Sequence, residues 1–412
     1  MNRSHCCEQA VLHELLDPLR RLFPVRLHDR ILLVGGCVRD LLRGVRWHDL
    51  DLAAALTPSE FESCGFRLVT GRSTLPVWFY HDESIGTVEA VALESMERLE
   101  DDLRRRDFTI NALALTLDTR LIDPLAGQQG LDLGALVPCS ARSFVEDPLR
   151  VVRAFRFESQ GWRLTTESEG LIAARQWDDA LQDIPVERFS RELQKALAAG
   201  DPARFFQRLV RYNVGRHWLP ELFQMPQVPA GPLNYHPEGD LLTHTLQVLQ
   251  RVAVRSGDPL ARFCAFCHDL GKLSTAPSRY PQHHGHDKAG FQPVQALCER
   301  LRLPSRWRDA AAWTSRLHTK ANLMATLRPA TLLTMVAQAR KAGIIEILPL
   351  VSAADKQAQM DHGLWSQAVA VAALSTVQLG IDPLRLAALA PAKRAGYLLQ
   401  KRVERLQSLR GG

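Results

Sequence analysis

Two aspartates near the N-terminus are spaced for metal-dependent chemistry. Asp49 and Asp51 are separated by a single leucine in the segment HDLDL. In an extended strand, residues two apart point to the same face, so the two carboxylates are expected side by side. Two divalent metals about 4 Å apart are the usual arrangement for attack on a phosphorus atom, and paired carboxylates hold such ions. Asp-x-Asp also occurs at strand ends as ordinary turn chemistry, so the pair needs support from its neighbours.

That support comes from a glycine turn just upstream. The apolar run 31–34 reads as a buried strand, and Gly35, Gly36 and Arg39 follow it in the segment LVGGCVRD. Two glycines before a helix start expose backbone N–H groups to phosphate oxygens, and the arginine adds positive charge. Together with the aspartate pair, this turn favours a nucleotidyl-transfer site.

Two further segments place arginines beside acids. The first, DLRRRDFTINA, contains Arg106 and Asp107, and the second, EDPLRVVRAFRF, begins like a helix with acids and a proline. A row of this kind usually marks a solvated helix face. It can also present a paired acceptor and donor to a nucleotide base, with later arginines at phosphates. The row recurs every three residues along the second segment: Asp147, Arg150, Arg153 and Arg156.

Histidines and aspartates form a second constellation downstream. His244 is followed by His268 and Asp269 in FCHDLGK, and then by Asp355. Imidazoles and carboxylates from different helices can bind a divalent metal and activate water. Each histidine taken alone has the simpler interpretation of a capped or solvated residue. Three more histidines are candidates to complete a second metal site: His283, His286 and His318.

The elements that must position these residues change character along the chain. Apolar spacing predicts a helix over 9–22, and after about residue 145 only helices are expected. The fold class is therefore α+β, with an N-terminal α/β head followed by an all-helical neck and body. The expected strands cover 31–34, 50–53, 67–70, 77–80, 86–93 and 110–115.

Composition narrows the class of protein. The 412 residues are 46% hydrophobic and 23% charged, which is typical of a folded globular chain and excludes general disorder. No apolar run approaches the roughly 18 residues of a membrane span, so no membrane association is expected. The eight cysteines show no disulfide framework, and with no secretory signal evident this predicts a cytoplasmic protein. The net charge of +6 is a weak indication of a nucleic-acid partner, and the oligomeric state stays open.

Four motifs in order resemble the bacterial-class tRNA nucleotidyltransferases, which build the 3′-terminal CCA of tRNA, and the related poly(A) polymerases: LVGGCVRD, HDLDLA, DLRRRDFTINALAL with LIDPLAG, and EDPLRVVRAFRF. The resemblance implies that Asp49 and Asp51 are catalytic and hold two Mg²⁺. It implies that Gly36 and Arg39 contact the nucleotide phosphates. The implied partners are tRNA, CTP and ATP.

The same resemblance assigns the remaining motif residues. Arg106 and Asp107 lie where the family recognises the ribose. Asp147 and Arg150 match the protein template that pairs with the edge of C or A. The later arginines of that helix, Arg153 and Arg156, match nucleotide-binding positions.

The downstream histidines and aspartates resemble HD-type metal phosphohydrolases, a domain found in a subset of these nucleotidyltransferases. This implies phosphatase or cyclic phosphodiesterase activity on RNA ends, and a divalent transition metal is a candidate for the HD site. Relatives commonly have His-Asp where this chain has His318-Thr319. We expect five regions: an N-terminal helical extension at 1–28, the nucleotidyltransferase head at 29–137, a helical neck at 138–223 for nucleotide templating and RNA binding, an HD metal domain at 224–365 and a helical tail at 366–412.

Two departures from the family pattern leave alternatives open. The segment 94–99 is shorter than the flexible loop of full CCA-adding relatives, as in enzymes that add only CC. The stretch before Ile31 is longer than in close relatives. CCA addition is the expected function, and the alternatives are CC addition alone, a poly(A) polymerase, or an HD phosphohydrolase whose head only binds RNA. Arg208, Arg211 and the basic C-terminal run are candidates for contact with the tRNA body.

Overall fold

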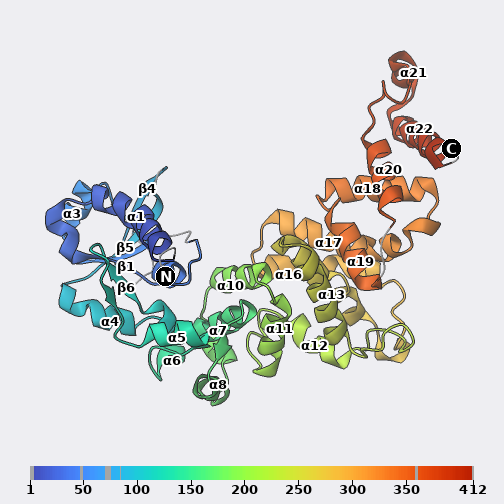
Figure 1. Ribbon diagram of the computed structural model, residues 1–412. Coiled ribbons are helices and arrows are strands. Elements are labelled where there is room, and N and C mark those ends of the chain that lie inside the picture. The colour runs from blue at the N-terminus through green and yellow to red at the C-terminus, as the bar shows by residue number, and fades with distance from the viewer. Residues whose placement is uncertain (1–3, 47–49, 70–75, 84, 358–360, 411–412) are drawn as a thin grey trace. The chain divides into compact units, whose positions relative to one another are not determined.

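The computed structural model describes residues 4–46, 50–69, 76–83, 85–357 and 361–410. The chain divides into two compact units (Figure 1). The head unit comprises residues 1–154 and 161–175, and the helical unit comprises residues 155–160 and 176–412. Helix α7 (Leu149–Ser159) therefore begins in the head unit and ends in the helical unit.

The head unit is built on a mixed seven-stranded sheet in the order β3-β4-β5-β2-β1-β6-β7. Strands β2 and β5 are parallel, and the other neighbours are antiparallel. A separate two-stranded sheet pairs β8 with β9. The strands are β1 (Ile31–Val34), β2 (Leu50–Ala54), β3 (Arg67–Val69), β4 (Val77–Asp82), β5 (Gly86–Ala92), β6 (Ala114–Thr116), β7 (Leu121–Ile122), β8 (Ala135–Leu136) and β9 (Arg163–Leu164).

Five of the six expected strands are confirmed within a residue or two. The expectation of a strand over 110–115 is wrong in its first half, because residues 109–111 form a 3-10 turn. That turn brings the side chain of Asn111 within hydrogen-bonding distance of Asp107, which an extended strand would not do. The strand β9 lies beyond residue 145, where only helices were expected. It has only two residues, too few for a readable alternation.

Alternating side chains give the sheet two buried faces. Ile31 and Leu33 pack with α1 (Ser4–Leu22) and α3 (Pro58–Ser63), whereas the opposite face packs against α4 (Leu99–Arg104). Figure 1 shows α3 and α4 on opposite sides of the sheet. The N-terminal extension is thus part of the head core rather than a separate appendage. Its helix contributes Leu15, Leu16 and Leu19.

The other head helices connect the strands and lead into α7. They are η1 (Val25–Arg30), α2 (Gly36–Leu42), η2 (Met96–Arg98), η3 (Thr109–Asn111), α5 (Gly127–Leu133), α6 (Ser143–Glu146) and α8 (Thr166–Ala173). Much of the stretch expected as neck, 138–154 and 161–175, is grouped with the head unit.

The described part of the helical unit contains helices and no strand. Its early members are α9 (Asp178–Leu181), α10 (Val186–Ala198), α11 (Pro202–Arg211), α12 (Pro220–Gln224), η4 (Met225–Gln227), α13 (Leu241–Arg255) and α14 (Pro259–Cys267). The middle members are η5 (Leu270–Ser274), η6 (Pro277–Arg279), α15 (His286–Ala289), α16 (Phe291–Arg300), α17 (Ser305–Asn322) and η7 (Met324–Thr326). The last are α18 (Pro329–Lys341), α19 (Ile347–Lys356), α20 (His362–Ala373), α21 (Pro383–Ala388) and α22 (Pro391–Arg410).

The core of this unit forms around α14, whose residues from Leu260 to Cys267 are all buried. It contacts α13, α17 and α19, the helices that carry most of the second constellation. Among the described residues, no helix combines the length and apolar character that crossing a bilayer requires.

Candidate functional site

The turn after β1 depends on a glycine. Gly35 has a φ of +79°, a backbone conformation that side chains disfavour. A Cβ at this position would lie 2.6 Å from Arg106 Nη1 and 3.5 Å from Asp51 Oδ2. The turn, the arginine and the aspartate therefore meet at one place. Arg106 Nη2 is 3.1 Å from Asp102, and its buried Nε has no hydrogen-bond partner among the described residues.

Carboxylates gather on one face of the sheet beside this turn. Asp51 on β2 pairs in parallel register with Glu89 on β5, so both residues lie on the same face. Asp49 lies outside the described residues. Our sequence interpretation did not single out Glu89, although the alternation of the strand 86–93 could have placed it opposite Asp51.

A continuous hydrogen-bonded network links the glycine helix α2 to α7. Arg39 Nη1 donates to Asn111 Oδ1 at 2.6 Å, and Asn111 Nδ2 donates to Asp107 Oδ1 at 2.8 Å. Arg153 contacts Asp107 Oδ2 through Nε at 2.8 Å and Nη2 at 2.6 Å. Burial favours the neutral acid, but Arg153 and Asn111 outweigh it and lower the pKa of Asp107 to about 2. The carboxylate is thus ionised, and it orients Arg153 directly and Arg39 through Asn111.

The start of α7 is held next to this network. Asp147 Oδ1 accepts from the backbone N–H of Leu149 at 3.2 Å, as an N-terminal cap does. Arg150 Nη1 donates to the carbonyl and hydroxyl of Ser143 at 3.1 and 2.9 Å, and Nη2 donates to the Arg105 carbonyl. Ser143 Oγ in turn donates to the Asp107 carbonyl at 3.1 Å. The guanidinium of Arg150 is therefore fixed in direction before any ligand arrives.

Arg156 has different surroundings from the other residues of its row. It is buried in the helical unit, where its Nε is 2.8 Å from Glu192 Oε2 on α10 and its Nη1 donates to Gln160 at 2.9 Å. Contact with a nucleotide phosphate would break this buried pair. The geometry favours a structural role, in place of the nucleotide-binding role expected from its spacing.

The second constellation assembles into two groups of metal-type ligands. His244 on α13, His268 after α14 and Asp355 on α19 place one ligand atom each within 4.8 Å of one another. Asp269, His286 and His318 do the same.

One carboxylate lies between the two groups. Asp269 Oδ2 is 3.4 and 3.3 Å from the Nε2 atoms of His244 and His268, and Oδ1 is 3.1 and 3.3 Å from those of His286 and His318. A bridging carboxylate in this position suits a two-metal centre.

Buried polar atoms without partners support a metal at this centre. Among the described residues, His244 Nε2, His268 Nε2 and Asp269 Oδ1 are buried and lie 3.3, 3.3 and 3.1 Å from their nearest ligand neighbours, without a hydrogen bond of good geometry. Such atoms are rare in folded proteins and call for an ion or another ligand. Imidazole nitrogens and carboxylate oxygens are the donor set for divalent transition metals. Burial opposes the charged imidazolium, yet the nearby carboxylates of Asp269 and Asp355 raise the pKa of His244 to about 9, so a metal bound here would displace a proton from the ring.

His283 belongs to neither group, although the sequence made it a candidate metal ligand. Its Nε2 faces the Pro229 carbonyl at 2.8 Å and its Nδ1 faces Thr275 Oγ1 at 3.0 Å, so both nitrogens are engaged. His286, three residues further on, does reach the second group, where its Nε2 faces Asp269 Oδ1. Thr319 puts its hydroxyl 3.2 Å from His318 Nε2.

Comparison with known proteins now decides the family. Residues 77–137 match the poly A polymerase head domain, and residues 164–225 match the probable RNA and SrmB-binding site of polymerase A. The multifunctional CCA protein of Legionella pneumophila strain Philadelphia 1 is 37% identical over 332 residues, covering 75% of this chain and 79% of that protein. This chain belongs to the CCA-adding tRNA nucleotidyltransferase family. Membership implies the use of a divalent metal ion.

Solved structures of CCA-adding enzymes share the fold of this tRNA nucleotidyltransferase. The Thermotoga maritima enzyme complexed with tRNA aligns with a TM-score of 0.65 at 19% identity, covering 97% of this chain and 94% of that one. The Bacillus stearothermophilus enzyme in complex with CTP aligns with a TM-score of 0.62 at 23% identity, covering 93% and 87%. The expected α+β class, with a sheet-containing head followed by helices, is confirmed.

Proposed function

We propose that this nucleotidyltransferase adds the 3′-terminal CCA to tRNA from CTP and ATP. The observation that carries the proposal is the meeting of Asp51, Gly35 and Arg106 at the turn after β1, where a triphosphate can approach bare backbone. Asp51, with Asp49, would hold Mg²⁺, which favours the ionised 3′-hydroxyl and neutralises the triphosphate when bound. Arg106, through its unpartnered buried Nε, and Arg39 supply fixed positive charge for the phosphates as pyrophosphate leaves.

Selection of the base would fall to the first turn of α7. The carboxylate of Asp147 can accept a hydrogen bond and the guanidinium of Arg150 can donate one, a pairing that a base edge can match. Arg150 is already oriented by Ser143 and Arg105, so little side-chain entropy is lost when a nucleotide binds. Arg153 and Asp107 would then support the ribose side of the site.

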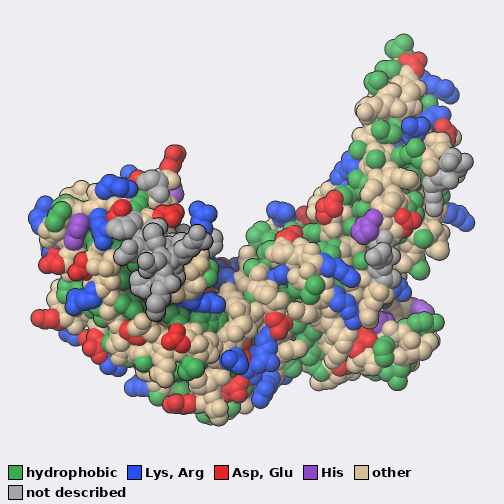
Figure 2. Space-filling model, in the orientation of Figure 1, with side chains coloured by type: hydrophobic (Ala, Val, Ile, Leu, Met, Phe, Trp, Pro, Cys, Tyr) green, Lys and Arg blue, Asp and Glu red, His purple; other side chains and the backbone are tan. Residues whose placement is uncertain are grey.

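Contact with the tRNA body would involve the helical unit. Figure 2 shows Lys and Arg side chains gathered near α11, inside the stretch that matches an RNA-binding region. Of the two arginines first considered there, Arg208 is buried and paired with Glu158, whereas Arg211 is exposed. Arg211 is therefore the better candidate for a phosphate contact. We place the enzyme with its tRNA substrate in the cytoplasm.

A single assay tests this function and its alternatives. The purified chain is incubated with Mg²⁺ and a tRNA transcript that lacks CCA, with labelled CTP and ATP supplied singly and together. We expect two C residues from CTP alone and a complete CCA from both nucleotides. Incorporation that stops at CC with both present would support the CC-adding alternative, and tailing with ATP alone would support a poly(A) polymerase. No incorporation at all would contradict every polymerase interpretation.

A second activity is supported by the buried histidine and aspartate groups. We propose that this HD centre binds two divalent transition metal ions and hydrolyses phosphate esters at RNA ends. Asp269 between the two groups and the unpartnered imidazole nitrogens support it. Metal-dependent hydrolysis of 2′,3′-cyclic AMP by the wild type, lost in His268→Ala, tests the proposal. Hydrolysis unchanged in that variant would place the activity elsewhere.

A further inference from the structure

The histidines of the HD centre share one pattern of hydrogen bonding. Three of them bind, through Nδ1, the backbone carbonyl three residues earlier. His268 binds the Ala265 carbonyl at 2.7 Å, His286 that of His283 at 2.7 Å, and His318 that of Ser315 at 2.8 Å. A carbonyl can only accept, so Nδ1 carries the proton in each ring and Nε2 keeps its lone pair for a metal.

His244 achieves the same result with a charged partner. Its Nδ1 lies 2.6 Å from Glu238 Oε1, and the side chains of both residues are buried. Glu238 comes just before α13, in a loop that ends where Asp240 caps the helix by accepting from the Thr243 N–H at 2.9 Å. The cap fixes the start of the helix and therefore the distance between the glutamate and the histidine.

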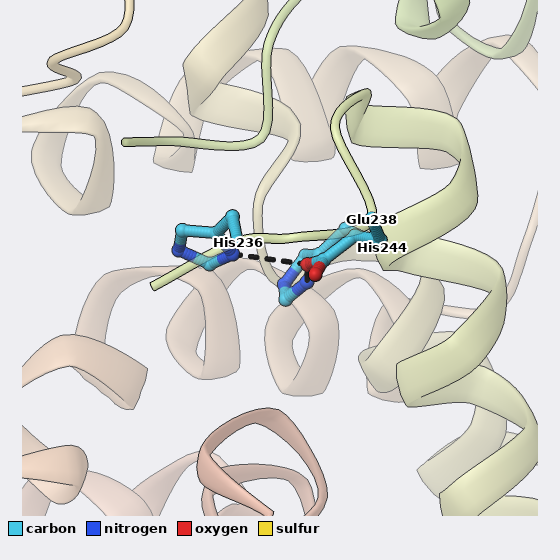
Figure 3. Close-up of side chains that lie close together, drawn as sticks. All are labelled: His236, Glu238 and His244. Carbon is cyan, nitrogen blue, oxygen red and sulfur yellow. Dashed lines mark hydrogen bonds and ion pairs between the residues drawn. The ribbon is translucent and has the colours of Figure 1, made fainter. Parts of the chain in front are cut away.

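A second histidine holds Glu238 in place. His236 Nδ1 lies 3.0 Å from the same oxygen, and its ring stands nearly perpendicular to that of His244, at 85° with centroids 4.8 Å apart (Figure 3). The ring of His236 packs on Gly231, where a Cβ would come within 2.3 Å of His236 Cδ2. His236 thus restrains the Glu238 carboxylate from the side opposite the metal ligands.

We propose that Glu238 is a positioning residue of the HD centre. Its carboxylate keeps the Nδ1 proton of His244 in place and so selects the tautomer whose Nε2 faces the metal ligands. The negative charge behind the ring also makes Nε2 a stronger donor, as carboxylate–histidine–metal arrangements do. Of the four histidines in the centre, His244 alone uses a carboxylate for this purpose. The inference rests on the proposed metal centre and adds a residue that touches neither metal nor substrate.

A comparable arrangement on the other side of the same group strengthens the case. Asn322 Nδ2 donates to Asp355 Oδ2 at 2.6 Å, and Ser352 Oγ donates to Asn322 Oδ1 at 2.6 Å, which fixes the direction of the amide. Asp355 Oδ1 is left facing His244 Nε2 at 3.3 Å. Both ends of the group His244, His268 and Asp355 are therefore oriented from behind.

The test measures Co²⁺ affinity of the full chain by its visible absorption, in the wild type, Glu238→Ala, Glu238→Gln and His236→Ala. Loss of an outer partner of this kind weakens metal binding about 10- to 100-fold, and we expect this for Glu238→Ala. Glu238→Gln keeps the volume and an acceptor oxygen but lacks the charge, so a smaller loss is expected. His236→Ala removes one restraint on Glu238 but keeps the carboxylate beside His244, so the affinity should fall clearly less than in Glu238→Ala.

A spectroscopic readout separates orientation from general damage. In histidine-labelled, Zn²⁺-loaded wild type, the Nδ1 proton of His244 should give a slowly exchanging ¹H–¹⁵N signal, and this signal should be lost in Glu238→Ala. Nucleotidyl transfer by the same variants reports whether the chain is folded.

The Co²⁺ affinities and the Nδ1 signal together distinguish failure of the metal centre from failure of the positioning role of Glu238. Wild type that binds no Co²⁺ would remove the metal centre itself, whereas wild-type affinity and an intact Nδ1 signal in Glu238→Ala would overturn only the positioning role. If Glu238→Ala does not fold, Glu238→Gln decides: wild-type affinity and an unchanged signal in that variant contradict the proposal.

Discussion

The two sites of this molecule surround their buried carboxylates with different partners. In the head, Asp107 is neutralised by a guanidinium of the protein itself, at 2.6 Å from Arg153 Nη2. In the HD centre, burial favours the neutral acid, but Lys272 and His268 hold the pKa of Asp269 well below its usual range. The head thus pairs Asp107 directly with an arginine, whereas in the HD centre Asp269 pairs with Lys272 at 2.6 Å and also faces four imidazole nitrogens at 3.1–3.4 Å.

This difference teaches what each site is built to receive. Paired arginines and acids form a rigid frame that a large anionic substrate can enter without rearranging buried charge. Imidazole nitrogens gathered around a carboxylate are a donor set that suits a divalent cation. The head is thus organised for a nucleotide substrate, and the HD centre fits the metal site proposed above.

The largest expected effect is the loss of nucleotidyl transfer in Asp51→Asn. Loss of one metal ligand removes several kcal/mol of transition-state stabilisation, so we expect incorporation of CMP to fall about 1,000-fold. Co²⁺ binding at the HD centre should stay at the wild-type level. His268→Ala should give the reverse result, with metal binding lost and CMP incorporation retained. A variant that damages both activities would show that the two sites are not independent.

A smaller effect is expected on the pH dependence of stability when Asp107 is replaced by Asn. Because this carboxyl is more acidic in the folded than in the unfolded chain, its ionised form stabilises the fold above about pH 4 and the contribution is lost toward pH 2. The advantage of the wild type over Asp107→Asn should therefore be about 2 kcal/mol at pH 6 and shrink as the pH falls to 3. Urea unfolding of both proteins at each pH measures it. A difference independent of pH would mean that the pKa of Asp107 is the same in the folded and unfolded chains, and an advantage that grows as the pH falls would mean that the carboxyl is neutral in the fold.

The sequence pointed to the candidate residues of both sites more readily than to the side chains that hydrogen-bond to those residues. Spacing along strands and helices placed Asp51, His244 and Asp355 because motif position and periodicity act within one segment. It missed Asn111, which an extended strand would have kept away from Asp107, and Glu238, which lies in a loop treated only as a connection.

Arg156 and His283 show the converse limit. Their spacing matched a site, but the pairing of Arg156 with Glu192 and of His283 with the Pro229 carbonyl depends on which segments pack together in the fold. Partners that come from distant segments leave no periodic signal in one sequence.

The smallest expected effect is that of replacing Arg98 in the short connection between β5 and α4. Arg98 lies there and pairs with Asp101 at 2.8 Å and with Glu94 at 3.8 Å, but all three side chains are at least half exposed. Exposed pairs of this kind contribute about 0–1 kcal/mol. The connection is instead held by Leu99, which is buried in the core on that face of the sheet.

Arg98→Ala should therefore leave the free energy of unfolding close to that of the wild type, whereas Leu99→Ala should cost about 2–4 kcal/mol. If the connection acts only as a structural link, the ratio of AMP to CMP incorporation should be the same in Arg98→Ala as in the wild type. A selective loss of AMP incorporation in this otherwise stable variant would instead assign its side chain to the change from C to A. The head would then contain an exposed charge that acts on the nucleotide without being fixed by a buried partner, which would weaken the contrast between the directly paired charges of the head and the imidazoles grouped around Asp269 in the HD centre.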